Sequence, residues 1–152
     1  MDDAREFMRL HRDAFREVTK VVETEPIWLT SVQIQMLHAE VIGRFGGRSG
    51  IRDLKLVESA LGRAQHRWTY EESATLHYLA TAYGFGLSKN HGFVDGNRRV
   101  GALAIRAFLA RNGQRFSPGD QAEMVAVFEG VASGAVDEET LARWIEANSE
   151  NA

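Results

Sequence analysis

The sequence predicts an all-α fold, and three observations support this prediction. Apolar residues recur at helical spacing along nearly the whole chain, whereas no alternating strand pattern extends beyond 27–29. The chain has 152 residues, 44% of them hydrophobic, which is enough for one domain with a core. Candidate caps and glycine turns divide it into segments of ordinary helix length. We therefore expect a compact helical domain with a buried central helix and a glycine-rich loop.

Residues 1–26 are expected to form an N-terminal helical extension, and residues 27–152 the main domain. Apolar side chains line one face of 4–23, which predicts the first helix, and Pro26 ends it because the residue before a proline is disfavoured in the α region.

The second helix is expected to begin at Thr30 or Ser31, since either can cap a helix N-terminus. It must end before Gly46 and Gly47. Another glycine follows within a few residues, so 46–53 should form an exposed, mobile loop.

Three further helices are predicted in the middle of the chain, and the last of them is expected to be central. Asp53 is a plausible cap for a helix over 54–66, and another helix is expected over 71–89. The segment 98–111 is apolar nearly all round, so we expect it to be the central helix. Asn112 and the glycine after it supply a left-handed end to that helix.

Two helices are predicted in the last third of the chain. Ser117 and Pro118 open the first, because proline is favoured in the first helical turn. Asp137 opens the second, which carries apolar residues at helical spacing.

The composition excludes several kinds of site. The chain contains no cysteine, so disulfides, thiolate zinc sites, iron–sulfur clusters and cysteine nucleophiles are excluded. The longest uncharged stretch, 73–88, is shorter than the roughly 20 apolar residues of a membrane span. The acidic start lacks the pattern of a secretion signal. We therefore expect a cytoplasmic protein that does not bind membranes.

Charge is unevenly distributed along the chain. The formal net charge is −3, but 89–115 carries +5 and 116–152 carries −7. Basic islands in a net negative domain suit a compact phosphate ligand better than duplex nucleic acid. The arginines of 98–111 could instead form a solvated face or a DNA recognition helix, but the second alternative would expose several large apolar side chains. We expect no direct nucleic-acid binding.

The segment 90–99, NHGFVDGNRR, concentrates polar residues and glycine between two predicted helices. A glycine turn that leads into a helix presents unpaired N–H groups and partial positive charge, which together attract an anion. The expected N–H donors are Gly96, Asn97 and Arg98. Arg98 and Arg99 would add guanidinium groups that match phosphate oxygens.

Three other residues of this segment complete a candidate site. Asp95 offers a hard oxygen ligand where a magnesium ion bound to nucleotide phosphates would need one. His91 can take a proton near neutral pH, and Phe93 should point inward and anchor the loop. The combination favours phosphoryl or nucleotidyl transfer. The other four histidines are interpreted as structural or surface residues, since no metal-ligand spacing connects them.

The same segment resembles the signature of the Fic/Doc superfamily, which is His, any residue, Phe, any residue, Asp or Glu, Gly, Asn, Gly or Lys, Arg. The matching residues are His91, Phe93, Asp95, Gly96, Asn97 and Arg99. The similarity extends from about residue 28 to about residue 144. It is specifically with the Doc, or death-on-curing, branch of type II toxin–antitoxin toxins.

The resemblance implies a helical domain that uses ATP with Mg²⁺ to modify a protein hydroxyl. His91 would be the general base, Asp95 the magnesium ligand, and Asn97 and Arg99 phosphate contacts. The loop before the third helix would be the flap that aligns the target peptide. Its residues are Gly46, Gly47, Arg48, Ser49, Gly50, Ile51, Arg52 and Asp53.

Position 98 separates two reactions within the superfamily. Members that transfer AMP carry glycine there, whereas Doc-type toxins carry lysine and transfer the terminal phosphate. Arg98 resembles the second group, and Ala102 stands where AMP-transferring members usually carry a second arginine. We therefore expect phosphate transfer, with AMP transfer as the alternative.

The Doc resemblance also implies partners. It suggests a Ser or Thr hydroxyl of elongation factor Tu as the target, inhibition of translation as the result, and a small antitoxin as the inhibitor. A catalytically silent member that only binds an antitoxin is a further alternative. The segment 19–23 partly resembles the inhibitory helix of some Fic proteins, although Thr24 replaces the expected glycine or asparagine.

Overall fold

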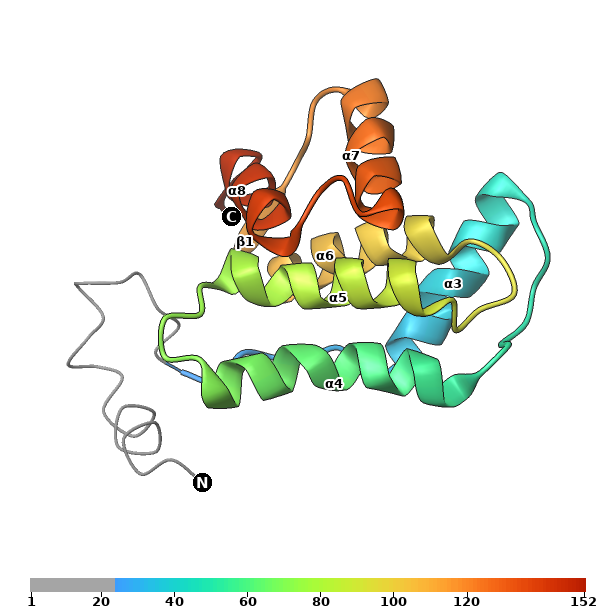
Figure 1. Ribbon diagram of the computed structural model, residues 1–152, viewed down its shortest axis with the longest axis horizontal. Coiled ribbons are helices and arrows are strands. Elements are labelled where there is room, and N and C mark those ends of the chain that lie inside the picture. Colours follow the sequence, from blue (N-terminus) through green and yellow to red (C-terminus); the bar gives the residue numbers. More distant parts are fainter. Residues whose placement is uncertain (1–23) are drawn as a thin grey trace.

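A computed structural model describes residues 24–152, which form six helices and one two-stranded sheet (Figure 1). The predicted helix over 4–23 lies outside the described residues. No helix of the described part is both long enough and apolar enough to cross a lipid bilayer. The elements in chain order are α3 (Ser31–Phe45), α4 (Leu54–Tyr70), α5 (Leu76–Asn90), α6 (Asn97–Arg111), β1 (Gln114–Phe116), α7 (Gln121–Ser133), α8 (Glu138–Ala147) and β2 (Ser149–Asn151).

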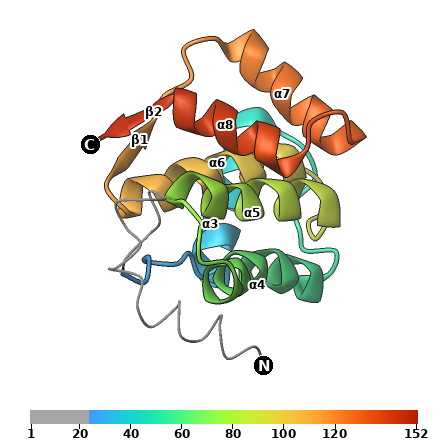
Figure 2. The ribbon, with the colours of Figure 1, turned by 60° about the vertical axis from the view of Figure 1, so that its left-hand side comes forward.

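The helices form three layers, with α5 and α6 in the middle, α3 and α4 on one side, and α7 and α8 on the other (Figures 1 and 2). The expectation of a buried helix at 98–111 is confirmed by α6, but α5 is equally buried and shares the centre. Small residues permit this close packing. A Cβ on Gly101 would lie 2.7 Å from Oγ of Ser88, and one on Gly86 would lie 2.9 Å from Cβ of Ala60.

Three predicted helix starts are confirmed by their caps. The Thr30 side chain accepts a hydrogen bond from the Gln33 N–H, and the Gln33 side chain accepts one from the Thr30 N–H, which is a complete capping box. Asp53 caps α4 and Asp137 caps α8 in the same way, through a side-chain oxygen.

Other predicted boundaries are wrong. The third helix continues to Tyr70 instead of ending at 66, and the next begins at Leu76 instead of 71, because Thr75 provides the cap. The helix expected to open at Ser117 and Pro118 begins at Gln121. There Asp120 accepts hydrogen bonds from two N–H groups of the first turn, so it is the stronger cap.

A short antiparallel sheet, absent from the predicted fold, joins the ends of α6 and α8 (Figure 2). Gln114 pairs with Asn151 and Phe116 with Ser149. The Ser117 N–H continues the ladder with a 2.9 Å bond to the Asn148 carbonyl. The sheet holds the C-terminal helices against the central pair, at the end of α6 opposite the candidate site.

Candidate active site

The loop 91–96 connects α5 to α6 at the end of the molecule where the flap, 46–53, also lies (Figure 1). Both ends of the loop have left-handed backbone conformations. Gly96 precedes α6 with a φ of 79°, and His91 follows α5 with a φ of 53°. His91 is the one non-glycine residue with positive φ among residues 24–152. Its side chain is exposed, so it is open to a ligand.

The N-terminus of α6 is open for an anion. Gly96 has no side chain and so provides no cap, and the first N–H groups of a helix have no acceptor within it. Arg98 and Arg99 are exposed in the first turn, and the Arg99 guanidinium lies 4.4 Å above the centre of the Phe45 ring. The partial positive charge of the helix terminus and two exposed arginines are therefore found in the same turn.

Asn97 holds the loop from inside. Its side chain is buried, with Oδ1 accepting a bond of 3.1 Å from the Phe93 N–H and Nδ2 donating one of 3.0 Å to the Phe93 carbonyl. Both polar ends of the Asn97 amide are thus used within the loop. Any contact of Asn97 with a phosphate would have to come from its backbone N–H.

Phe93 and His38 support the loop from below. Phe93 is 1% exposed, and the His38 ring stacks on it with 3.9 Å between ring centres. Nε2 of His38 lies 2.8 Å from the Asp95 carbonyl oxygen, which can only accept, so Nε2 carries the proton. His38 was expected to be structural. Its position on the inward face of a helix gave no sign that its partner would be the loop.

The carboxylate of Asp95 lies between the loop and the flap. Oδ2 accepts a 3.1 Å bond from the Arg48 N–H, and Oδ1 accepts a 2.9 Å bond from the Gly96 N–H. These two bonds, that from Arg48 first, lower the pKa of Asp95 below its ordinary value of 3.8. The side chain is exposed and ionised at neutral pH.

The donor set suits a magnesium ion that arrives with a nucleotide. No group of three or more acidic, histidine or cysteine side chains that could hold a metal exists among residues 24–152. One carboxylate beside an anion site is nonetheless the arrangement in which Mg²⁺ is held by a protein oxygen and substrate phosphates together. The residues therefore fit the ion only in company with a phosphate ligand.

The flap pairs with the loop along its backbone. The Val94 N–H donates to the Gly50 carbonyl at 3.1 Å, and Ile51 and Phe93 form an antiparallel bridge. The N–H groups of Arg52 and Asp53 both donate to the Gly92 carbonyl, at 2.8 and 2.9 Å. The predicted flap is therefore exposed, but its second half, residues 50–53, is attached to the loop through the backbone.

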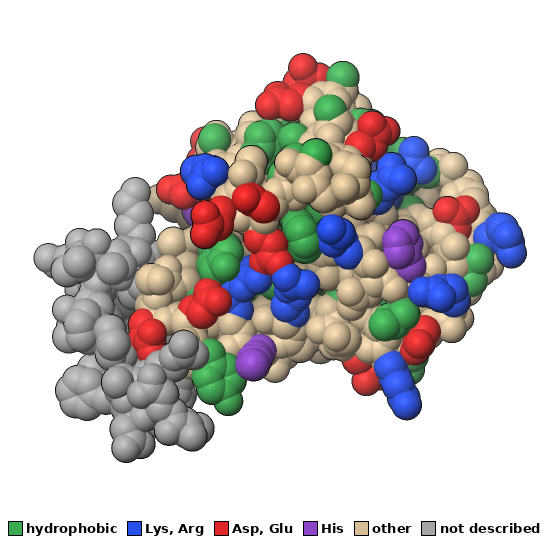
Figure 3. All heavy atoms as spheres, viewed as in Figure 1, with side chains coloured by type: hydrophobic (Ala, Val, Ile, Leu, Met, Phe, Trp, Pro, Cys, Tyr) green, Lys and Arg blue, Asp and Glu red, His purple; other side chains and the backbone are tan. Residues whose placement is uncertain are grey.

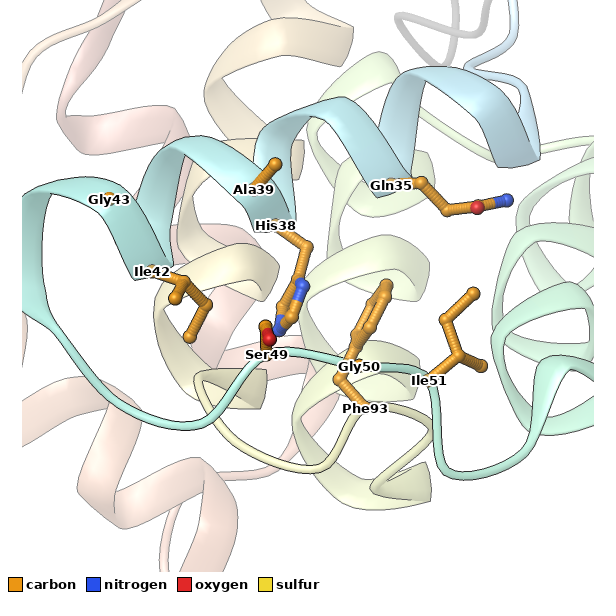
Figure 4. A pocket seen from close by; sticks show the side chains of 9 residues that line it. All are labelled: Gln35, His38, Ala39, Ile42, Gly43, Ser49, Gly50, Ile51 and Phe93. Carbon is orange, nitrogen blue, oxygen red and sulfur yellow. The ribbon is translucent and has the colours of Figure 1, made fainter.

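An open groove of about 410 Å³ lies between α3 and the flap (Figure 4). The stacked rings of His38 and Phe93 lie between its two sides, and Ile42 and Ile51 contribute apolar surface. These two rings line the floor of the groove but stay almost fully covered, with Phe93 1% and His38 5% exposed.

Cationic side chains gather at the end of the molecule that carries the loop (Figure 3). Several exposed cations belong to the flap, the loop and the adjoining helix ends, and the ion pairs found among the described residues do not include them. Those in the flap and in the first turn of α6 are Arg48, Arg52, Arg98 and Arg99. Such a surface attracts a polyanion.

Comparisons with known proteins cover the part of the chain that carries the flap and the loop. Residues 28–109 match the model of the Fic/DOC family, a span from α3 to most of α6 that includes the flap and the loop. The chain is also 32% identical over 106 residues to the protein kinase doc of Escherichia phage P1, covering 70% of this chain and 82% of that protein.

The chain belongs to the Fic/Doc family.

The Fic/Doc match places α3, the flap, α4, α5 and the loop within the shared domain, and α7 and α8 after it. The resemblance of the sequence to the Doc branch is confirmed by the similarity to the phage P1 protein. Phe45, which lies under Arg99, was not among the expected site residues. An apolar residue at the exposed end of a helix carries no signal of such a role.

Proposed function

We propose that this protein is a Doc-like toxin that transfers the terminal phosphate of ATP to a Ser or Thr hydroxyl of a target protein. The observation that carries the proposal is the uncapped N-terminus of α6, with exposed His91 and Asp95 in the loop before it and two arginines in its first turn. Phosphoryl transfer depends mainly on positioning and charge neutralisation, and these groups provide both.

His91 is proposed as the general base. The target hydroxyl gives its proton to the imidazole as its oxygen forms a bond to the γ-phosphorus of ATP. The bond between that phosphorus and the bridging oxygen breaks, and ADP leaves with the electron pair. Exposure of the His91 side chain at the end of α5 gives an incoming hydroxyl access to it.

The N-terminus of α6 is proposed to hold the phosphates. The N–H groups of Asn97 and Arg98 donate to phosphate oxygens, and the guanidinium groups of Arg98 and Arg99 offset their charge. Asp95 would hold the magnesium ion, which neutralises phosphate charge when it is bound with ATP. The flap would align the target peptide beside His91.

Arg98 supports phosphate transfer over AMP transfer. A glycine at this position would leave room for a diphosphate against the loop, whereas the exposed arginine occupies that room and attracts a single phosphate. Ala102, one turn further along α6, is buried and offers no second cation.

Partners follow from the same proposal. The Doc resemblance implies elongation factor Tu as the target, inhibition of translation as the outcome and a small antitoxin as the inhibitor. It also favours a cytoplasmic site of action, where elongation factors are found.

Labelled ATP tests the reaction directly. The full chain is incubated with Mg²⁺, a cell extract and ATP labelled in either the γ or the α position. We expect a labelled protein only with the γ label, and none with His91→Ala. His77→Ala is the matched control, because His77 lies at the far end of α5 and contacts Gln114. We expect it to retain labelling.

Two results would contradict the proposal. A protein labelled from the α position would show AMP transfer. Absence of label from both positions, together with a stable complex between this chain and a small antitoxin, would favour the catalytically silent alternative.

A further inference from the structure

The C-terminal end of α5 is closed differently from the other described helices. The residue after each of the others donates its backbone N–H to a carbonyl of the last turn, as Gly46 does to Ile42 at 2.9 Å. Among the described residues, the His91 N–H makes no such bond, although His91 has the left-handed conformation in which glycine is preferred. Some other contact must keep this backbone in place.

Arg52 of the flap supplies that contact. Its Nε donates to the His91 carbonyl at 2.8 Å, and a second guanidinium nitrogen lies 3.5 Å from the Asn90 carbonyl. The Arg52 backbone N–H donates to the Gly92 carbonyl at 2.8 Å. One residue therefore binds three successive carbonyl groups, and His91 is the middle one.

The chemistry of this contact suits its position. The last carbonyl groups of a helix accept no hydrogen bond from within the helix, and they carry partial negative charge. A cation beside them is therefore favourable. The planar guanidinium group can donate to two carbonyls at once, which an ammonium group cannot do with the same geometry. The contact is thus both electrostatic and directional.

The residues around Arg52 keep it in place. Asp53, directly after it, caps α4 through the Lys55 N–H and also donates its own N–H to Gly92. A side chain on Gly92 would collide with Val57 of α4, so the backbone after His91 packs against that helix. The flap end and the start of α4 therefore form one rigid support for the loop.

The geometry points to Arg52 as a positioning residue for His91. It holds the His91 backbone in the left-handed conformation and thereby sets the direction in which the imidazole leaves the chain. The Arg52 side chain therefore connects His91 to the flap, which is proposed to align the target. The inference rests on the proposed role of His91 as the general base.

Three variants of the full chain test the inference. Arg52→Gln removes the charge and the two-carbonyl contact, and Arg52→Lys keeps the charge with one donor group. Lys55→Gln removes an exposed cation three residues away whose side chain makes none of these contacts. Thermal unfolding of each variant is measured first, to check that it is folded.

The first measurement is steady-state transfer of the γ-phosphate. We expect Arg52→Gln to lower kcat by about tenfold or more, since small misplacements of reacting groups have effects of this size, while the KM for ATP changes little. Arg52→Lys should lose less, and Lys55→Gln should lose almost nothing. Equal losses in Arg52→Gln and Lys55→Gln would overturn the inference, because they would indicate a general charge effect.

The second measurement needs no activity. The test uses NMR spectra of the protein without ligand. The three-bond coupling constant and the intraresidue nuclear Overhauser effect between the amide and α protons of His91 report the sign of φ. We expect the left-handed signature in the wild-type protein and in Lys55→Gln, and its loss in Arg52→Gln. An unchanged signature in Arg52→Gln would overturn the inference even if no target were ever labelled. If the wild-type protein transfers no phosphate but Arg52→Gln still loses the left-handed signature, the result counts against the proposed function alone.

Discussion

His38 and Phe93 stack almost in parallel, with 3.9 Å between their ring centres and 7° between their planes. Because Nε2 of His38 also donates to the Asp95 carbonyl, one side chain of α3 supports two residues of the loop. The loop is therefore supported from α3 as well as by the two helices that it connects.

We predict that His38→Phe, which keeps a ring against Phe93 but removes the donor, lowers the free energy of unfolding by about 1 kcal/mol, the net contribution of a typical intramolecular hydrogen bond. Urea denaturation measures this change. Glu40→Gln on the same helix, which removes only an exposed ion pair with Arg44, should change stability by less than about 0.5 kcal/mol. Equal stability of His38→Phe and wild type would show that the hydrogen bond does not matter.

Asn97 offers a second stability test. Because its side chain bonds both to the N–H and to the carbonyl of Phe93, Asn97→Ala should lower the free energy of unfolding by about 1–3 kcal/mol in the absence of nucleotide. Arg106→Ala, an exposed change on the same helix, should stay within about 0.5 kcal/mol. If Asn97 served only as a phosphate contact, its removal would leave the stability of the free protein unchanged.

The pKa of Asp95 reports the contact between flap and loop. In the folded protein this pKa is lowered, chiefly by the Arg48 N–H, so the contact contributes stability above the ordinary aspartate pKa of 3.8 and loses it as the pH falls through the lower folded value. A Cβ on Gly47 would lie 2.8 Å from Oδ2 of Asp95. Gly47→Ala should therefore displace the flap and raise the pKa, measured from the carboxyl carbon by NMR.

Gly46→Ala is the matched control for that titration. Gly46 also has a positive φ, of 77°, but a Cβ there would meet nothing within 4 Å. Gly46→Ala should strain the backbone without changing the pKa of Asp95. An Asp95 pKa that is the same in wild type and in Gly47→Ala would mean that the flap does not lower it.

Tyr83 gives a prediction at alkaline pH. The residue is fully buried, and burial raises the pKa of its hydroxyl to about 12, although the Leu29 N–H donates to that oxygen. Since the ordinary tyrosine pKa is about 10, the folded state holds the proton longer, and roughly 3 kcal/mol of stability present below pH 10 is lost between pH 10 and about 12. The phenolate absorbance of Tyr83 is the difference between the absorbance of wild type and that of Tyr83→Phe. It should appear only as the pH approaches about 12.

Local rules predicted much of the helical fold because caps and apolar spacing act within a few residues. Thr30, Asp53 and Asp137 could be identified as caps from residue type and the helix pattern that follows. The join between α4 and α5 was misplaced. Helix α4 continues past residue 66 because Arg67 forms hydrogen bonds with residues distant in sequence, the Tyr78 carbonyl and Glu138. No sequence pattern near residue 66 reveals these contacts.

The small sheet could not be predicted for a similar reason. β1 and β2 have three residues each, too few for an alternating pattern. Two helices, α7 and α8, separate them in the sequence. Their pairing depends on where α7 and α8 return the chain.

The residue types of the candidate site were visible in the sequence, but their supports were not. The segment 91–99 carries its own signature, whereas His38 and the flap come from elsewhere and meet the loop only in the folded chain. The left-handed conformation of His91 was also not foreseen, because the next residue is a glycine and would have been the natural choice for it.

The most direct test is a crystal structure of the full chain with Mg²⁺ and an ATP analogue that cannot be hydrolysed. We predict that the γ-phosphate lies within about 3 Å of the N–H groups at the start of α6, with the His91 imidazole facing the same phosphorus. A nucleotide bound away from this helix terminus, or one whose α-phosphate faces His91, would contradict the proposed phosphate transfer.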